Sequence, residues 1–484
     1  MTPLQIVLCA IAVLVVLLVA IVLVRTLNFK PKKIEIASSE KVKIDEKKVV
    51  EHFQTLLRFK TITVTDVENG DYTEFEKLIE YIQKTYVNVF KACEFERVDK
   101  LGLVLKLKGK SSENSSVLMS HYDVVPVVEA NWATAPFDAV IKDGRIFARG
   151  ALDNKATMLC GLEGLEGILA KNPNFKPEFD LYFTFGGNEE TSGASQQAIV
   201  AKFKKENVRP HLVLDEGGAI VKNIFPGVSE DIAVVGLAEK GVANLELTVV
   251  SGGGHASTPS KNNPVNVLAR ALVNIEKHPM KPFIVPPIAQ MCDTLGRHSK
   301  FALKLVFANM WLFKGLVKKL FTVISTETNA MLTTTFAYTV LEGSNAHNVL
   351  PAQAKANLNT RIANNHDLDM VIAHLKKVIN DDRVTITPVM AYNPSPMAAV
   401  DGFAFKTVER VLNEVYPEVI VSPYVMLAAS DSRFYGEISS EVLKFAPFKM
   451  TKEQRGSIHG NNENIEISTL IRGVEFYNNL ILKL

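Results

Sequence analysis

The sequence predicts an α/β domain with a mostly parallel sheet, interrupted by an inserted α+β domain and preceded by a transmembrane helix. Three observations lead to this fold class. Strands and helices alternate through residues 45–239, which is typical of βαβ units. Residues 240–390 instead contain amphipathic strands and two helices, which is typical of a smaller antiparallel α+β unit. Residues 4–24 form an uncharged apolar run that is long enough to span a membrane.

The composition of the chain is that of an ordinary globular protein, and it excludes several classes of function. The 484 residues exceed the size of one comfortable core, so we expect two domains and an appendage. A formal net charge of +2 and scattered basic residues give no indication of a nucleic-acid partner. The cysteines are too few and too widely spaced for a disulfide framework or a cysteine metal site. We expect unpaired thiols at Cys9, Cys93, Cys160 and Cys292.

The apolar segment at residues 4–24 predicts a single-pass anchor, followed by a polar linker up to residue 44. About 21 apolar residues suffice to cross a hydrocarbon core of about 30 Å. A cleaved signal peptide would have a basic start and a shorter apolar run, and no Lys or Arg precedes residue 4. Basic residues after the span favour a cytoplasmic body, whereas a glycosylation triplet at Asn114 favours the opposite side. The sequence leaves both placements open.

Residues 45–239 are expected to form the first part of the larger domain. Apolar residues at helical spacing predict helices from residue 45 onward and at 74–89, 156–170 and 195–205. Strands are predicted at 102–108, 116–120, 179–185 and 211–214. In such an arrangement, functional residues gather where the parallel strands end.

Residues 240–390 are expected to form the inserted domain, and residues 391–484 return to the larger one. The pattern predicts helices at 264–277 and 368–379, and strands at 242–251, 333–341, 354–362 and 384–389. An added segment, residues 286–328, is rich in large apolar residues interrupted by lysines. This segment is either a buried helical pair or a surface that lines a substrate channel or contacts a bilayer.

Histidines and acids follow the predicted strands, although each one alone has an ordinary structural explanation. His121 directly follows an apolar strand, and Asp123 lies on the same side of the extended chain. Asp123 can therefore accept the second ring N–H of a metal-bound imidazole. Asp153 precedes a predicted helix, where it could serve only as a cap. The other candidates are two pairs of adjacent acids at strand ends and a histidine in a glycine-rich loop, namely Glu189, Glu190, Asp215, Glu216 and His459.

Taken together, these side chains predict a metal centre. Two histidines with several carboxylates supply the N and O ligands that suit zinc, cobalt or manganese. Without cations, the acids would repel each other or bind protons at raised pKa values. Two divalent ions about 3.5–4 Å apart remove this repulsion and are a common hydrolytic arrangement. We therefore expect two zinc ions, with cobalt or manganese as alternatives, in a hydrolase.

A series of motifs resembles a known family. In chain order they are His121-x-Asp-Val-Val-Pro, Gly150-Ala-Leu-Asp-Asn-Lys-Ala, Glu189-Glu190, Asp215-Glu216-Gly-Gly, Gly254-His255, Asn348-Val-Leu-Pro with Arg361, and Gly456-Ser-Ile-His459-Gly. They resemble the co-catalytic zinc hydrolases, which include aminoacylases, carboxypeptidase S and bacterial desuccinylases. The resemblance extends from Asp45 to the end of the chain. It implies a zinc-exopeptidase-like domain with an inserted lid or dimerisation domain.

Within this family, the chain is most similar to carboxypeptidase S and to the N-fatty-acyl-amino acid synthase/hydrolases. Trp311-Leu-Phe and Ser430-Asp-Ser-Arg-Phe-Tyr435 carry this closer resemblance. The N-terminal anchor is more similar to carboxypeptidase S than to the secreted synthase/hydrolases. The resemblance therefore favours a lumenal or extracellular body.

The resemblance also implies which residues bind the metal ions. Asp153 would bridge the two ions. The other four ligands would be divided between the ions as His121 with Glu216, and Glu190 with His459. Asp215 is the alternative to Glu216, and the sequence does not decide between them.

Glu189 would be the general base rather than a ligand. It would take a proton from a water molecule held between the ions and deliver it to the leaving amine. Asp123 would act beside it by orienting a metal-bound histidine. Many relatives have an Asp where this chain has Asn188, and we expect this difference to adjust the surroundings of Glu189 without abolishing catalysis.

The inserted domain is expected to contribute substrate contacts. His255 resembles the family histidine that polarises the scissile carbonyl. Asn348 and Arg361 resemble residues that bind the substrate carboxylate, and Arg433 is a second candidate for that contact. In dimeric relatives, the histidine and asparagine can come from the partner subunit. Segment 286–328 could cover that dimer surface, so monomer and homodimer both stay open.

The expected reaction is metal-dependent hydrolysis of an amide bond next to a free carboxylate, as in a carboxypeptidase. The substrate would be a small peptide or an N-acyl amino acid. One alternative is an N-fatty-acyl-amino acid hydrolase and synthase, or an aminoacylase, which the apolar segment 286–328 favours. A further alternative is an inactive, membrane-anchored binding protein. That alternative predicts that a metal ligand or the general base is missing. All of these residues are present in the sequence.

Overall fold

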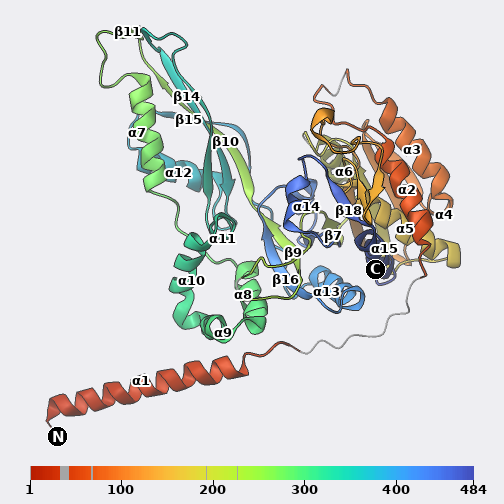
Figure 1. Ribbon diagram of the computed structural model, residues 1–484, viewed down its shortest axis with the longest axis horizontal. Helices are drawn as coiled ribbons and strands as arrows, with labels where there is room; N and C mark the ends of the chain where they lie inside the picture. The colour runs from red at the N-terminus through yellow and green to blue at the C-terminus, as the bar shows by residue number, and fades with distance from the viewer. Residues whose placement is uncertain (1, 33–42, 67–68, 192, 226) are drawn as a thin grey trace. The chain divides into compact units, whose positions relative to one another are not determined.

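The computed structural model describes residues 2–32, 43–66, 69–191, 193–225 and 227–484 (Figure 1). These residues form two compact units. Unit 1 contains residues 1–30, 238–395 and 425–429, and unit 2 contains residues 31–237, 396–424 and 430–484. Each unit has its own sheet, and each is described separately below.

The large sheet has nine strands and a parallel centre. Its strand order is β1-β2-β6-β3-β7-β17-β9-β16, and β8 pairs with β9. The strands are β1 Glu94–Val98, β2 Gly102–Leu107, β3 Ser111–His121, β6 Phe179–Gly186, β7 Pro210–Asp215, β8 Ile220–Val221, β9 Ile232–Glu239, β16 Ile420–Met426 and β17 Val442–Lys444. Strands β6, β3, β7 and β17 are parallel neighbours, whereas β1, β2 and β8 pair in antiparallel fashion. The predicted α/β class with a mostly parallel sheet is therefore confirmed, with antiparallel strands toward its edges.

Up to residue 205, the helices of unit 2 agree with the predicted pattern except at one position, and three further helices follow residue 402. They are α2 Glu46–Arg58, α3 Thr73–Thr85, α4 Val87–Ala92, α5 Lys155–Lys171, α6 Ala194–Lys205, α13 Phe403–Val415, α14 Lys452–Ser457 and α15 Ile467–Ile481. The single helix predicted at 74–89 is wrong, because α3 ends before Tyr86 and α4 begins after it. Tyr86 has non-helical backbone angles (φ −100°, ψ 60°), and its buried hydroxyl donates to Glu163 on α5. The break thus directs this ring into the core, which apolar periodicity does not reveal.

Helix α5, which begins two residues after Asp153, is buried on almost all sides. It packs so closely against α15 that a Cβ atom at Gly164 would lie 2.9 Å from the backbone nitrogen of Asn478. The Asn478 side chain also donates to the Gly164 carbonyl at 3.0 Å. A glycine is therefore required at this contact, which fixes α5 against the C-terminal helix.

A small antiparallel sheet joins two distant parts of unit 2. It consists of β4 Val140–Lys142, β5 Arg145–Phe147 and β18 Asn464–Glu466, in the order β18-β5-β4. Pairing of β5 with β18 places the chain just before Asp153 beside the chain just after His459. The two loops that carry these side chains are thus brought together by backbone hydrogen bonds.

Unit 1 contains a four-stranded antiparallel sheet, in the order β12-β14-β10-β15. Its elements are β10 Gly241–Val250, β11 Gly254–His255, α7 Pro264–Lys277, β12 Thr335–Glu342, β13 Val349–Leu350, β14 Gln353–Ile362, α12 Leu368–Ile379 and β15 Thr385–Tyr392. Apolar residues of α7 and α12 form a core with one face of the sheet, including Leu245, Leu358 and Leu375. Alternate residues of β14 are buried, as expected for a sheet covered on one face.

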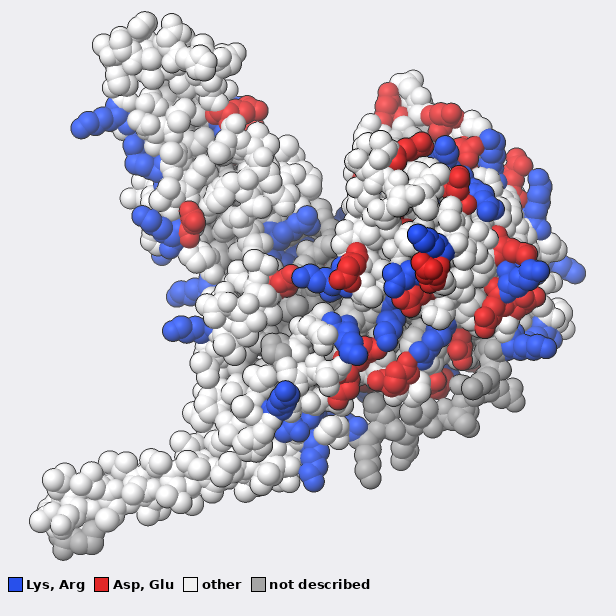
Figure 2. Space-filling view, viewed as in Figure 1, with Lys and Arg blue, Asp and Glu red and all other residues white. Residues whose placement is uncertain are grey.

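Unit 1 also contains helix α1 and the helices of the added segment. They are α1 Pro3–Asn28, α8 Pro286–His298, α9 Phe301–Ala308, α10 Met310–Ile324 and α11 Thr326–Leu332. Among the described residues, α1 alone is long and apolar enough to cross a membrane, and Figure 2 shows its surface almost free of charged side chains. The helical pair considered for residues 286–328 is instead a chain of helices, because non-helical residues interrupt it at Ser299, Asn309 and Ser325.

Candidate metal centre

The predicted ligands of unit 2 gather where the parallel strands end. His121 is the last residue of β3 and pairs with Gly186, the last residue of β6. Glu189 and Glu190 follow β6 within a few residues, and Glu216 directly follows β7. Because β6, β3 and β7 are adjacent and parallel, their ends present these side chains at one edge of the sheet.

Asp153 lies between the two histidines. One of its carboxylate oxygens is 2.8 Å from Nε2 of His121, and the other is 3.0 Å from Nε2 of His459. His459 is also 3.0 Å from Glu190 Oε2, and His121 is 3.5 Å from Glu216 Oε1. The five predicted ligands therefore form one continuous cluster centred on Asp153.

Two groups of potential ligand atoms each lie within 4.8 Å of one another. One group contains His121, Asp153 and Glu190, and the other contains His121, Glu189 and Glu216. His121 belongs to both groups, so these distances alone do not divide the ligands between two ions. Glu189 lies as close to this cluster as the predicted ligands do.

The electrostatics of the cluster fit a divalent cation. Burial and the nearby Asp153 carboxylate together raise the pKa of Glu216 to about 8, although His121 opposes this shift. Hydrogen bonds to Asp153 and Glu190 raise the pKa of His459 to about 10. Burial opposes protonation of His121, but the surrounding carboxylates hold its pKa well above the usual range. Bound protons can supply the positive charge that these carboxylates require, and a divalent metal ion would supply the same charge in their place.

Glu190 provides a second observation that fits a metal ion. Its Oε1 atom is buried and has no hydrogen-bond partner among the described residues. A buried carboxylate oxygen normally requires a donor or a cation. The donor set of imidazole nitrogens and carboxylate oxygens suits zinc, cobalt or manganese.

Asp123 holds two parts of the cluster in place. Its carboxylate lies 3.3 Å from Nδ1 of His121 and accepts hydrogen bonds from the backbone N–H groups of Glu189 and Glu190 at 3.2 and 3.1 Å. The side chain is completely buried. Asp123 therefore fixes both the ring of His121 and the loop that carries the acid pair.

The side chains of Asp215 and Glu216 lie in different surroundings. Asp215 Oδ2 accepts a hydrogen bond from the backbone N–H of Ser432 at 3.0 Å, whereas Glu216 is the acid that lies beside His121. Asn188 likewise turns away from the cluster, because its side-chain oxygen accepts from both the N–H and the hydroxyl of Ser195 at the start of α6. Asn188 therefore fixes the loop before α6.

Glu463 is a residue that the sequence analysis missed. It is completely buried, and its carboxylate accepts hydrogen bonds from Arg149 at 2.6 Å and from the backbone N–H groups of Gly150, Leu152 and Asp153. It therefore holds the loop that presents Asp153. Its local sequence, Asn-Asn-Glu-Asn, resembles an exposed loop and gives no signal of this role.

We expect Glu463→Gln to destabilise unit 2 by about 3–5 kcal/mol, because it leaves the buried Arg149 guanidinium without its anion. The matched control is Glu466→Gln, which removes a half-exposed partner of Arg145 and should cost about 1 kcal/mol or less. Urea unfolding followed by circular dichroism measures both variants. Equal midpoints for the two variants would contradict the role given to Glu463.

Two predicted substrate contacts lie together in unit 1, and a third lies apart from them. His255 on β11 pairs with Val349 on β13, and the Ala256 N–H donates to the Asn348 carbonyl at 3.1 Å. His255 is exposed, and its ring nitrogen Nδ1 forms a hydrogen bond with the Ser257 hydroxyl at 2.7 Å. Arg361 lies near the C-terminal end of β14, about 25 Å along the strand from the end that follows β13. Unit 1 therefore does not bring Arg361 to His255 and Asn348.

Arg433 lies in unit 2 and has partners of its own. Its guanidinium donates to the Ser430 carbonyl at 2.8 Å, lies 3.5 Å from Asp431 Oδ1 and stacks on the Phe434 ring at 4.3 Å. Burial raises the pKa of Asp431 to about 7, although Arg433 lowers it. Asp431 lies against Gly193, which has φ +66° and has no room for a Cβ atom. The motif that contains Arg433 thus packs against the loop of the acid pair.

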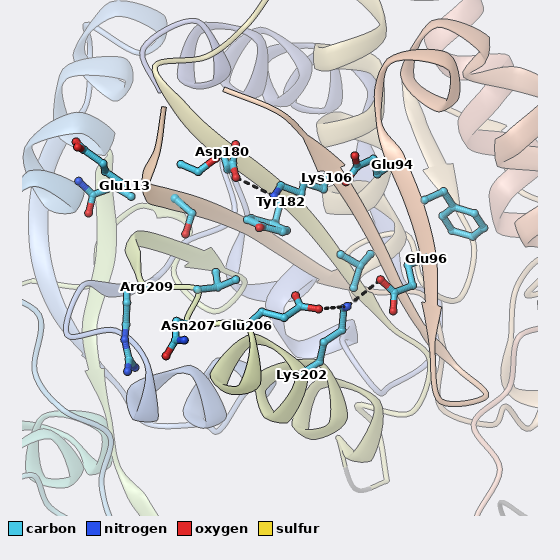
Figure 3. A pocket seen from close by; sticks show the side chains of 16 residues that line it. Glu94, Glu96, Lys106, Glu113, Asp180, Tyr182, Lys202, Glu206, Asn207 and Arg209 are labelled. Carbon is cyan, nitrogen blue, oxygen red and sulfur yellow. Dashed lines mark hydrogen bonds and ion pairs between the residues drawn. The ribbon is translucent and has the colours of Figure 1, made fainter. Parts of the chain in front are cut away.

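A separate hollow in unit 2 lies far from the cluster along the sheet. It is a cavity of about 520 Å³ at the N-terminal ends of β3 and β6, near Ser112 and Asp180 (Figure 3). Two of its lysines are paired within it, Lys106 with Asp180 and Lys202 with Glu96 and Glu206. The metal-ligand cluster lies at the opposite strand ends.

Comparisons with known proteins agree with this geometry. The model of peptidase family M20/M25/M40 matches residues 117–483. A protein of Dictyostelium discoideum named "Probable carboxypeptidase S-like 2" is 30% identical over 96% of this chain and 92% of its own length. An N-fatty-acyl-amino acid synthase/hydrolase of Xenopus tropicalis is also 30% identical, over 98% of this chain and 94% of its own length. Both similarities extend over almost the whole chain.

Solved structures show the same fold at lower sequence identity. An M20 family metallo-carboxypeptidase from Sulfolobus solfataricus has a TM-score of 0.64 at 19% identity, covering 91% of this chain and 99% of the other. Human carnosine dipeptidase 1 has a TM-score of 0.59 at 15% identity, covering 90% and 96%. The fold of this chain is thus shared with a metallo-carboxypeptidase and with a dipeptidase.

Proposed function

Because the chain belongs to peptidase family M20/M25/M40 and is a metal-dependent hydrolase, we propose that it cleaves an amide bond next to a free carboxylate, as carboxypeptidases do. The observation that carries this proposal is the Asp153 carboxylate, which contacts both His121 and His459. The 30% identity to a carboxypeptidase S-like relative over nearly the full chain supports the same substrate class.

We assign the metal site to five ligands and two zinc ions, with cobalt or manganese as alternatives. The ligands are His121, Asp153, Glu190, Glu216 and His459. The position of Asp153 between the histidines supports a bridging role, and the position of Glu216 beside His121 favours it over Asp215. When bound, such ions lower the pKa of water and polarise a carbonyl group.

Glu189 is assigned as the general base. A carboxylate oxygen of this residue lies within 4.8 Å of atoms from both His121 and Glu216, and Asp123 fixes its backbone N–H. Burial raises the pKa of Glu189 well above its usual range, so it can hold a proton between two steps. The carboxylate takes the proton of the attacking water and then gives it to the nitrogen of the leaving amine.

The substrate contacts follow from the chemistry of the reaction. His255 is assigned to the developing oxyanion, and Asn348 to the free carboxylate of the substrate. Arg361 and Arg433 are the candidates for the free carboxylate. The separation of Arg361 from His255 within unit 1 favours contributions from two subunits, as in a homodimer. A monomer in which only one arginine is used is the alternative.

Hydrolysis of N-fatty-acyl amino acids is the second candidate function. The exposed apolar side chains of α9 and α10, together with the Xenopus tropicalis relative, favour a long acyl chain. An aminoacylase acting on short acyl groups belongs to the same reaction class. An inactive binding protein requires a defective site, and each expected ligand and the base is present in this chain.

A substrate panel with metal-depleted and zinc-restored protein tests these alternatives. We expect the metal-depleted protein to lose at least about 100-fold in kcat/KM and to recover it with zinc. A blocked dipeptide such as an acyl-Gly-Leu should be turned over faster than a long-chain acyl-Phe if the enzyme is a carboxypeptidase. The reverse order would replace that assignment with the fatty-acyl alternative. Unchanged activity after complete metal removal would contradict both assignments.

We further propose that α1 is an uncleaved single-pass membrane anchor. Its apolar length supports a span, and its buried C-terminal contacts with α9 favour retention over cleavage. The basic residues after the span favour a cytoplasmic body, whereas the exposed Asn114 of the Asn114-Ser-Ser triplet and the family resemblance favour a lumenal or extracellular one. Glycosidase treatment of protein from a eukaryotic host separates the two topologies.

A further inference from the structure

The C-terminal end of α1 is fixed to the added helices of unit 1. The side-chain nitrogen of Asn309 donates to the Val22 carbonyl and to the Thr26 hydroxyl, both at 3.2 Å. Arg25 donates to the Ala308 carbonyl at 3.3 Å. Val22 and Thr26 are buried, in contrast to the rest of α1, and α9 lies beside this end of the helix (Figure 1).

A second contact fixes the chain just after α1. Arg297 on α8 stacks on the Phe29 ring at 4.3 Å and donates to the Lys30 carbonyl at 3.0 Å. Arg297 also forms a bidentate ion pair with Asp293. The junction between α1 and the added helices is therefore held by ring, backbone and side-chain contacts. If α1 spans a bilayer, these contacts place α9 and α10 at the membrane surface.

Helix α10 has apolar residues on two opposite sides. Val317 and Phe321 are buried against the protein. On the other side, Leu316 and Val323 are 51% and 72% exposed. The exposed apolar face of α10 consists of Leu312, Leu316 and Val323, which share this side of the helix at helical spacing. Phe301, Trp311 and Ile324 are further exposed apolar side chains of α9 and α10. Exposed apolar side chains grouped in this way mark an interaction site.

The charges around this face are of one sign. The sequence contains no Asp or Glu between Asp293 and Glu327, but it contains lysines at 300, 304, 314, 318 and 319. A helix with Leu and Val on one face and with Trp and Lys beside that face is typical of helices that lie in a membrane interface. Anionic lipid headgroups attract such lysines, whose long stems can reach the polar layer.

A basic cavity opens where α1 ends. Its volume is about 620 Å³, and it lies between α1, α8 and α10. Arg25, Arg297 and Lys314 line it together with Trp311, and Asp293 is an acid among its lining residues. Since Asp293 pairs with Arg297, the lining carries net positive charge. The phosphate groups of a bilayer lie at this level, just outside the hydrocarbon core that α1 would cross.

We propose that α9, α10 and the end of α1 form a docking platform for an anionic phospholipid leaflet. The exposed apolar face enters the acyl region, and the basic cavity binds a lipid phosphate group. This inference rests on the proposed anchor. It explains why α10 has apolar residues on the side that faces away from the protein.

Trp311 tests the platform directly, because Trp132 is the only other tryptophan. The full chain with Trp132→Phe is reconstituted in phosphatidylcholine nanodiscs that contain roughly a third phosphatidylserine. We expect brominated acyl chains to quench the Trp311 emission at least about twofold, and aqueous iodide to quench it little. Strong quenching by iodide with none by bromine would overturn the platform.

Two variants in the same background make the test specific. Leu316→Glu should abolish the bromine quenching, whereas Val389→Glu, at an exposed site on β15, should leave it unchanged. Lys314→Glu should remove the difference in quenching between discs with and without phosphatidylserine. Equal quenching in the two kinds of disc before that substitution would overturn the proposed phosphate contact.

Alkaline carbonate extraction separates failure of the platform from failure of the anchor. Protein that stays in the membrane while Trp311 faces water contradicts the platform alone. Protein that is released contradicts the anchor as well. Neither outcome alters the hydrolase assignment, which is measured by turnover of a soluble substrate.

Discussion

Glu189→Gln is expected to lower kcat by about 10²–10⁴-fold while the metal content of the protein stays unchanged. The amide keeps the size of the side chain, but it can neither accept the proton of the attacking water nor return it to the leaving amine. The backbone N–H of residue 189 would still donate to Asp123, so the loop should keep its position. Steady-state kinetics and elemental analysis on the same preparation measure both quantities.

The matched control for this substitution is Glu113→Gln, because Glu113 is an exposed acid at the opposite end of β3. It should keep the parental kcat and metal content. Wild-type turnover by the Glu189→Gln enzyme would remove the base role from this residue. Loss of metal together with turnover would instead make Glu189 a ligand, which its proximity to His121 and Glu216 also permits.

Asp153→Asn is expected to lower the metal content and to reduce kcat/KM by at least about 100-fold. Asp153 is the one carboxylate that contacts both histidines among the described residues of the cluster. Burial opposes ionisation of Asp153, but hydrogen bonds from the histidines hold its pKa below the usual range, so it is the ionised acid at the centre of the site. An amide in its place supplies no negative charge to balance two divalent ions.

Asp143→Asn is the control for this change, because Asp143 lies in the exposed turn between β4 and β5 and asparagine tolerates its positive φ. It should bind metal and turn over substrate as the parent does. Full metal content in the Asp153→Asn protein, measured after dialysis against a weak chelator, would contradict the bridging assignment. Asp153→Asn should lose metal and turnover together, whereas Glu189→Gln should lose turnover alone. This difference distinguishes a metal ligand from the general base.

Local patterns in the sequence predicted the central strands of unit 2, the helices around them in the first part of that unit, and the antiparallel sheet of unit 1. Strands β3, β6 and β7 and helices α5 and α6 were predicted because a buried face imposes a fixed apolar period. Three of the residues proposed as ligands, His121, Glu190 and Glu216, were found for a related reason, whereas Asp153 and His459 were implied by the family resemblance. Acids and histidines that directly follow apolar strands must lie at one edge of a parallel sheet, and the structure brings them together there.

The tertiary structure alone decided the features that depend on contacts between distant segments. The break at Tyr86, the support of Asp153 by Glu463, and the different surroundings of Asp215 and Glu216 all depend on residues far away in the chain. The attachment of α1 to α9 is of the same kind, since Asn309 has no local feature that indicates its partners. Periodicity records which side of an element is buried, but it does not record what that side is buried against.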